Sequence, residues 1–378
     1  MNLLVTGGAG FIGSHYVRLA LERYPEAKIV VLDALTYAGN LSTLKDVQDH
    51  PNFSFHHGLI QDMEFVDGIF HRERISHVVN FAAESHNDRS LMASGGFIQT
   101  NTFGVHVLLE ATRKHGVERM LHVSTDEVYG SVDKGHFTED SPLQPNTPYS
   151  ASKAGGDLQC RAHHVSFKTP VVVTRGGNNY GPYQYPEKLI SFFTVRLIDG
   201  KKVPLYGEGH QVREFIHVMD HCEGIDTALR LGKDGEVYNI GDKNERRNID
   251  TVKILLDELF GDPLPRDGSC MREGAGGGSP AVEAPPPNPP PQTQSFRGVG
   301  LIKKIPDPRK GAHDARYSMS TQKIESLGWK PTRSFDEELR ATVRWYKDNE
   351  WWWRPITEKP EYKDFIRAFY GPGLGEDL

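Results

Sequence analysis

The chain has 378 residues and a formal net charge of −6, which allows one large α/β domain with a smaller lobe. Lysine and arginine are not clustered, so we expect no nucleic-acid partner and no membrane surface. We expect no membrane span and no signal peptide, because no apolar run is long enough and no apolar leader precedes the first motif. Cys160, Cys222 and Cys270 have neither disulfide nor metal-ligand spacing, which fits a reducing cytoplasm.

Short apolar runs alternate with helical patterns through the first half of the chain. Helices are expected, for example, at residues 14–23 and 101–115. The expected strands span residues 3–5, 28–33, 53–55, 78–81, 120–124 and 171–173. This alternation predicts an α/β fold with a Rossmann-like, doubly wound parallel sheet.

A glycine-rich loop joins the first expected strand to the first expected helix. Gly7, Gly10 and Gly13 would let backbone N–H groups approach a pyrophosphate at the helix N-terminus. Asp33 follows at the end of the second strand, where an acid bonds the ribose hydroxyls and would repel the 2′-phosphate of NADP. A lone glycine triplet is often only a tight turn. With the strand, the helix and Asp33 in register, the pattern predicts an NAD site.

The glycine spacing, G-x-x-G-x-x-G, resembles the extended short-chain dehydrogenase/reductase superfamily, and a second signature of that superfamily is also present. Tyr149 and Lys153 share one helix face because they are four positions apart. A nearby ammonium and a positive nicotinamide ring would lower the pKa of the phenol. Thr125 would complete a catalytic triad by bonding the substrate hydroxyl. Alone, the pair would be solvated side chains on a surface helix.

Two adjacent acids, Asp126 and Glu127, follow the strand that ends near Thr125. Neighbouring side chains on a strand point to opposite faces, so the strand should stop at Ser124 or Thr125 and let both acids turn into a cleft. Such a pair offers a general acid and a general base, one protonated and one ionised, as elimination of water requires. The alternative is a helix N-terminus or a solvated loop.

Several longer motifs resemble the dTDP-glucose 4,6-dehydratase family. The resemblance runs from Met1 to about Asp262, resumes near Ile302 and ends around Ile356. It rests on residues 32–40 (LDALTYAGN), 81–86 (FAAESH), 124–130 (STDEVYG), 178–183 (NNYGPY) and 186–190 (PEKLI).

The resemblance implies an activity and a role for each catalytic residue. Tyr149 takes the proton of the C4 hydroxyl while NAD+ accepts the C4 hydride, which gives a ketone that acidifies the C5 proton. Glu127 removes that proton, and Asp126 protonates the departing C6 hydroxyl. The hydride then returns to C6, so the reaction is that of a lyase, and its substrate is dTDP-glucose.

The resemblance also implies two sets of binding residues. Arg213 should hold the diphosphate, and Pro204 and Tyr206 should flank the thymine. The substrate set is Ser85, Thr125, Asn178, Lys188, Leu189, Pro204, Tyr206, Arg213, Asn248, Arg309 and His313. The cofactor set is Gly7, Gly10, Phe11, Ile12, Gly13, Asp33, Ala34, Leu35, Thr36, Gly39, Leu59, Ile60, Ala82, Ala83, Thr100, Tyr149 and Lys153.

The chain departs from the family pattern at several of these places. Leu59 stands where an Asp usually bonds the adenine amine, which should weaken cofactor retention without moving the chemistry. Ala34 replaces a common basic residue. The segment before His313 is one residue longer than usual, so either Arg309 or Lys310 could meet the diphosphate. Elsewhere, Ser191 replaces a frequent Pro and Met219 an acid.

The expected domains are a Rossmann domain at 1–177, to which later segments return, and a smaller α/β substrate-binding lobe at 178–356. Within that lobe, residues 263–300 are rich in Gly and Pro and cannot bury a core. We interpret them as a surface insertion that is disordered or partly polyproline II. The alternatives are a partner-binding proline tract and a sequence or splicing artefact. Residues 357–378 are expected to be a C-terminal tail. The family also implies a homodimer formed through helices at 101–115 and 149–166.

Two other functions stay open. The first is another nucleotide-sugar dehydratase or a 4-epimerase that acts on a UDP- or GDP-linked sugar; an epimerase would not need Asp126 and Glu127. The second is a catalytically silent NAD-binding protein, whose substrate lobe the insertion disables. The intact set of Thr125, Asp126, Glu127, Tyr149 and Lys153 argues against it.

Overall fold

A parallel sheet forms the centre of the larger part of the protein. The computed structural model describes residues 1–132, 134–261, 299–307 and 316–375. In these residues seven parallel strands lie in the order β10-β6-β5-β4-β1-β2-β3. The predicted Rossmann-like sheet is confirmed. The strands are β1 (Asn2–Thr6), β2 (Lys28–Asp33), β3 (Phe53–His57), β4 (His77–Asn80), β5 (Arg119–Thr125), β6 (Val171–Gly176) and β10 (Val237–Ile240).

Helices cover both faces of this sheet because both faces of its strands are apolar. On β1, Leu3 and Val5 point into one core and Leu4 into the other. The first core includes side chains of α1 (Phe11–Arg23) and α8 (Val218–Leu231). The second includes side chains of α2 (Met63–Glu73), α5 (Val105–His115) and α6 (Pro148–Phe167).

A capping box fixes where α6 begins. The Thr147 side chain accepts a hydrogen bond from the backbone N–H of Ser150, and the Ser150 hydroxyl accepts one from the N–H of Thr147. Pro148 occupies the first helical position, where its missing N–H costs nothing. The box therefore sets Tyr149 in the first turn of the helix.

The helix predicted at 101–115 is α-helical only from Val105 onward. Residues Gln99–Gly104 form a π-helical turn that leads into α5. Inside this turn the Asn101 amide donates to the Ser152 hydroxyl and to the Glu84 carbonyl, each at 2.9 Å. Such turns often occur at functional sites, and hydrophobic periodicity does not reveal them.

The second lobe is built around an aromatic-rich core that includes Trp353, Tyr346 and Phe192. Its strands are β7 (Asn178–Tyr180), β9 (Val212–His217) and β11 (Glu245–Arg247) in one sheet, and β8 (Val203–Tyr206) and β12 (Ile302–Ile305) in another. Its helices are α7 (Leu189–Ile198), α9 (Asn248–Phe260), α11 (Phe335–Asp348), α12 (Glu350–Glu358) and α13 (Pro360–Leu374).

The remaining helices of the described residues are short. These are α3 (Asn87–Met92), α4 (Gly95–Ile98), α10 (Gln322–Glu325) and 3-10 turns at Leu41–Leu44, Asp126–Tyr129 and Val299–Leu301. None of the helices in the described part of the chain has the length and apolar character needed to cross a membrane.

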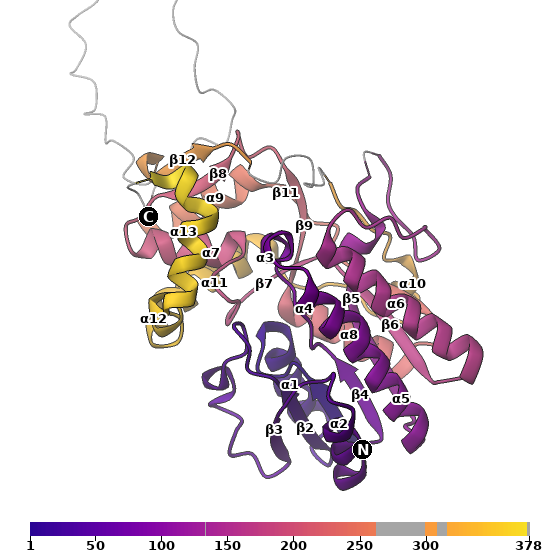
Figure 1. The fold of residues 1–378 in the computed structure, drawn as a ribbon. Helices are drawn as coiled ribbons and strands as arrows, with labels where there is room; N and C mark the ends of the chain where they lie inside the picture. The colour runs from indigo at the N-terminus through magenta and orange to yellow at the C-terminus, as the bar shows by residue number, and fades with distance from the viewer. Residues whose placement is uncertain (133, 262–298, 308–315, 376–378) are drawn as a thin grey trace, which may run out of the picture.

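The C-terminal segment differs from the expected tail. Within residues 357–378, α13 buries Tyr362, Phe365 and Ile366 in the core of the second lobe. In Figure 1 this helix, in yellow, lies beside β8 and β12. Most of the Gly/Pro-rich segment expected at 263–300 lies outside the described residues, as do Arg309 and His313.

Candidate active site

One continuous cavity lies between the carboxyl ends of the sheet strands and the second lobe. Its lining includes most of the residues selected from the sequence. They are Gly7, Gly10, Phe11, Ile12, Gly13, Asp33, Ala34, Thr36, Gly39, Leu59, Ile60, Ala82, Ala83, Ser85, Thr100, Thr125, Asp126, Glu127, Tyr149, Lys153, Asn178, Lys188, Leu189, Pro204, Tyr206, Arg213 and Asn248.

The glycine loop lines this cavity, and at two of its positions the surrounding backbone leaves no room for a side chain. Gly7 has a φ of +69°, and a Cβ there would lie 2.7 Å from the backbone nitrogen of Ala82. A Cβ on Gly13 would lie 2.2 Å from the Gly7 carbonyl oxygen. No side chain caps α1, whose N-terminus borders the cavity. Its first N–H groups therefore suit a phosphate.

Asp33 is held beside this loop by two backbone hydrogen bonds. Its carboxylate accepts from the N–H groups of Ala9 at 2.9 Å and Leu35 at 2.8 Å. Burial raises its pKa. A Cβ on Gly39 would approach an Asp33 oxygen to 2.7 Å, so the absence of a side chain at position 39 keeps this carboxylate accessible.

Two residues of the predicted cofactor set, Leu59 and Leu35, offer the cavity no polar side chain. Leu59 is 45% exposed at the cavity wall and offers no hydrogen bond from its side chain. Leu35 does not line the cavity, contrary to the prediction. Its backbone has a φ of +49°, and its side chain packs against the core on the α1 side of the sheet.

The two acids both line the cavity because β5 ends at Thr125, as predicted. A 3-10 turn follows directly and frees Asp126 and Glu127 from strand alternation. The Thr125 hydroxyl donates to Asp126 Oδ1 at 3.0 Å and accepts from the Glu127 N–H at 3.3 Å. Burial of Asp126, together with the charge of Glu127, raises the pKa of Asp126 well above its usual range. Asp126 is therefore suited to act as an acid.

Glu127 has a partner that the sequence analysis missed. The Asn87 amide donates to Glu127 Oε2, and the Asn87 oxygen accepts from the Thr147 hydroxyl at 2.8 Å. Thr147 thereby orients Asn87 so that its donor faces the carboxylate. A lone Asn 40 positions before Glu127 gives no sequence signal for this contact.

Tyr149 and Lys153 extend from α6 to the same cavity, but the phenol differs from the expectation. Its burial and the charge of Glu127 raise the pKa of Tyr149, whereas the sequence predicted a lowered value. A hydrogen bond with Thr125 acts in the opposite direction. The Lys153 ammonium donates to the Val123 carbonyl at 2.6 Å, and burial lowers the pKa of Lys153 to about 8.

The second lobe contributes cations and amides to the cavity. Lys188 Nζ donates to the Ser85 carbonyl at 3.1 Å and thus ties the lobe to the loop after β4. The Arg213 guanidinium lies 5.2 Å from the ring centre of Tyr317, a cavity residue that the sequence analysis also missed. Asn248 lies at the first position of α9.

Replacing Asp126 with asparagine should stabilise the protein while impairing its reaction. The folded-state pKa lies above the unfolded one, so ionisation of Asp126 costs stability at high pH, and this cost disappears below the unfolded pKa. We expect the free energy of unfolding to rise by about 1–3 kcal/mol at pH 8, with no gain below about pH 4. Urea unfolding at several pH values measures this; Asp364→Asn, at an exposed position, is the control. An equal rise in the free energy of unfolding at acid pH would show that ionisation of Asp126 is not the cause of the gain.

Comparison with known proteins gives consistent matches along the chain. The family model described as GDP-mannose 4,6 dehydratase matches residues 4–262. The chain is 42% identical to the dTDP-glucose 4,6-dehydratase of Streptomyces niveus, over 96% of this chain and 97% of that protein.

Solved structures agree with these matches. DesIV, a dTDP-glucose 4,6-dehydratase from Streptomyces venezuelae with NAD bound, has a TM-score of 0.81 and 44% identity; the match covers 94% of this chain and all of that one. A dTDP-glucose 4,6-dehydratase from Bacillus anthracis in complex with NAD has a TM-score of 0.79 and 41% identity, over 94% of this chain and 99% of that one.

Proposed function

Because the chain belongs to the GDP-mannose 4,6 dehydratase family, and within it to the dTDP-glucose 4,6-dehydratases, we propose that it converts dTDP-glucose to dTDP-4-keto-6-deoxyglucose. The observation that carries this proposal is the pair Asp126 and Glu127 in the cavity that Tyr149 and Lys153 also line. Oxidation of an alcohol needs only the roles given to Thr125, Tyr149 and Lys153. Elimination of water also needs a general acid and a general base.

The residues present fit NAD as the cofactor. The glycine loop leaves room for a pyrophosphate at the uncapped N-terminus of α1, and Asp33 is positioned for the ribose hydroxyls. Bound there, NAD+ would accept the hydride from C4 of the sugar and later return it to C6. Its positive ring would also lower the pKa of Tyr149 and offset the effects of burial and of Glu127.

The acids and bases of the chain then act in order. Tyr149 takes the proton of the C4 hydroxyl, which Thr125 orients. Glu127, held by Asn87, removes the C5 proton that the new ketone has made acidic. Asp126, whose pKa burial raises, gives its proton to the C6 oxygen, which leaves as water. When the hydride returns to C6, Glu127 gives the proton it removed back to C5.

The nucleotide part of the substrate would lie against the second lobe. We assign Arg213 and Lys188 to the diphosphate, because cations satisfy phosphate oxygens and both residues line the cavity. The same lining supports Pro204 and Tyr206 beside the thymine, with further contacts from Ser85, Asn178, Leu189 and Asn248. Arg309 and His313 remain predictions outside the described residues. Cys160 and Cys222 are free, as a reducing compartment favours, so we also propose that the protein is cytoplasmic.

The proposed activity is tested with the purified chain, NAD and dTDP-glucose, without added reductant. We expect the mass of the product to correspond to the loss of one water. UDP-glucose and GDP-mannose in parallel reactions test the alternative nucleotides. An isomer of unchanged mass would indicate an epimerase instead. No product from a folded, NAD-loaded protein would indicate a silent binding protein.

Asn87→Ala should lower kcat by about tenfold, the effect of losing one hydrogen bond to a charged group. KM should change little because Asn87 contacts the proposed base rather than the binding residues. Steady-state kinetics with dTDP-glucose measure both constants. Asn52→Ala, at a position far from the cavity, is the matched control. An effect on KM alone would show that Asn87 contributes to binding instead.

We also propose a homodimer, as the family resemblance implied. The surface formed by α5, α6 and the π-helical turn exposes several large apolar side chains. Phe103 is 40% exposed and Phe167 is 54% exposed, and the rings of His106 and His163 lie between them in a continuous row. Leu158 and Val165 are also exposed on α6. Isolated apolar residues are normal on a surface, but such a group indicates an interface.

Phe167→Glu should convert the proposed dimer to monomers, because it replaces an exposed apolar ring at the interface with a charged side chain that would lose its water there. Sedimentation measures the mass of the particle, and we expect it to be halved at the same protein concentration. Leu231→Glu, at a similarly exposed position at the end of α8, is the control and should leave the mass unchanged. A wild-type protein that sediments as a monomer would refute the proposal.

A further inference from the structure

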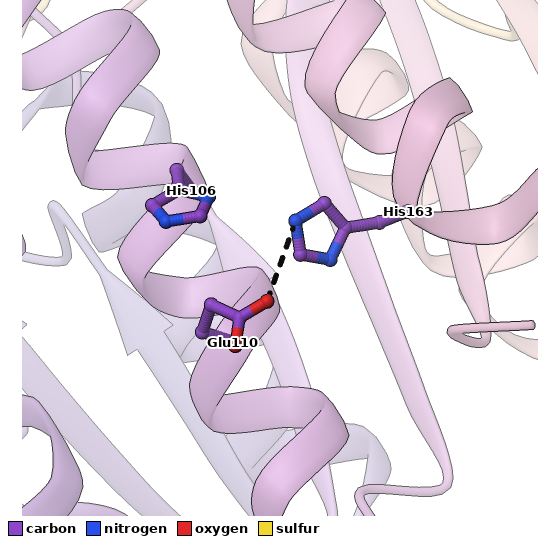
Figure 2. Close-up of side chains that lie close together, drawn as sticks. All are labelled: His106, Glu110 and His163. Carbon is purple, nitrogen blue, oxygen red and sulfur yellow. Dashed lines mark ion pairs between the residues drawn. The ribbon is translucent and has the colours of Figure 1, made fainter. Parts of the chain in front are cut away.

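Three side chains with metal-ligand chemistry meet outside the cavity, where α5 and α6 pack together. His106 and Glu110 lie one turn apart on α5, and His163 points toward them from α6 (Figure 2). One ligand atom from each residue lies within 4.8 Å of those of the other two. We propose that His106, Glu110 and His163 form a binding site for one zinc ion, separate from the proposed active site.

The ligand types and their spacing fit this ion. Zinc commonly binds imidazole nitrogen and carboxylate oxygen, with bonds of about 2.0–2.2 Å. Tetrahedral ligands at that bond length lie about 3.4 Å apart. Glu110 Oε1 is 3.7 Å from His163 Nε2, so this pair needs only a small adjustment. Two imidazoles and one carboxylate leave the fourth position for water.

The two imidazoles are not committed to other strong contacts. His163 is 4% exposed, and its Nδ1 has no hydrogen-bond partner among the described residues. The 3.7 Å between its Nε2 and Glu110 is too long for a hydrogen bond. In the same part of the chain, no hydrogen bond holds the His106 ring, which packs against the rings of Phe103 and His163. Zinc would therefore displace no strong interaction of either ring.

Glu110 is held by Arg113 in a way that leaves one oxygen available. Arg113 Nη2 donates to Oε2 at 2.7 Å, whereas Oε1 is the oxygen that faces His163. The positive guanidinium opposes a second cation nearby, but it also fixes the carboxylate in one orientation, as outer partners of metal ligands do.

Zinc binding is tested by calorimetric titration of the full chain after chelator treatment. We expect wild-type protein to bind one more equivalent of Zn2+ than His163→Ala. Glu110→Gln keeps the shape of the site and should bind Zn2+ at least about tenfold more weakly. His115→Ala, on the same helix but paired with Asp67, is the control and should match the wild type.

Two further measurements make the result decisive. Co2+ in place of Zn2+ should give the visible absorption of a tetrahedral site in wild type and not in His163→Ala. NAD binding should be unchanged in all variants, which shows that they are folded. Equal zinc stoichiometry and affinity in wild type, His163→Ala and Glu110→Gln would overturn the proposal, as would a wild-type protein that binds no zinc. Neither result depends on the proposed dehydratase activity.

Discussion

Glu127→Gln is expected to lower turnover of dTDP-glucose by about 10²–10⁴-fold, the usual contribution of a general base. The glutamine keeps the shape of the side chain and can still contact Asn87, but it cannot accept the C5 proton. Mass analysis of the sugar measures the loss of water. Exchange of the C5 hydrogen with deuterated solvent should be lost in parallel.

The same variant separates oxidation from elimination. Tyr149, Thr125 and Lys153 remain in place, so oxidation at C4 should still occur, and the absorbance of NADH should rise after the substrate is added. Glu118→Gln is the control for the substitution itself, because this 72% exposed side chain directly precedes β5, at the opposite edge of the sheet from the cavity. Turnover that survives in Glu127→Gln would show that another group removes the C5 proton.

Asp220→Ala is expected to reduce the free energy of unfolding by about 3–5 kcal/mol, because it removes the buried acceptor of several hydrogen bonds, one of them from a charged group. Asp220 is fully buried in the first turn of α8. It accepts hydrogen bonds from the hydroxyl and N–H of Thr332 and from the N–H and guanidinium of Arg333, the last at 2.6 Å. Alanine would leave all four donors without this acceptor.

Urea unfolding of Asp220→Ala tests this value. Lys304→Ala removes one member of an exposed ion pair with Glu208 and should change the free energy of unfolding by no more than about 1 kcal/mol. Similar losses in the two variants would mean that burial of Asp220 does not determine its contribution. Asp220→Asn keeps part of the acceptor capacity and should fall between alanine and wild type.

The features that the sequence predicted well are local. The glycine loop, the end of β5 and the face shared by Tyr149 and Lys153 each depend on the spacing of a few neighbouring residues. Hydrophobic patterns over similar distances located β1, β2 and α1. These predictions need no knowledge of which distant segments meet.

The features that sequence reasoning missed depend on tertiary contacts. Asn87 reaches Glu127 only because α3 packs beside α6 at the sheet edge. The pKa of Tyr149 rises because the folded chain buries the phenol close to Glu127, and no local pattern reports that distance. The sequence predicts a tail at 357–378 because the resemblance ends around Ile356, although the buried aromatic residues of α13 complete the core of the second lobe.

The late return of α8 and β10 to the central sheet affects how the protein forms during synthesis. When the ribosome has made only the first 180 residues, β6 is an open edge, and the apolar face that α8 later covers is exposed. An unpaired edge strand beside exposed apolar surface favours aggregation. The nascent chain therefore carries an incomplete nucleotide-binding domain until about 60 more residues have been made. A chaperone bound during that interval would protect the open edge and the apolar face from aggregation.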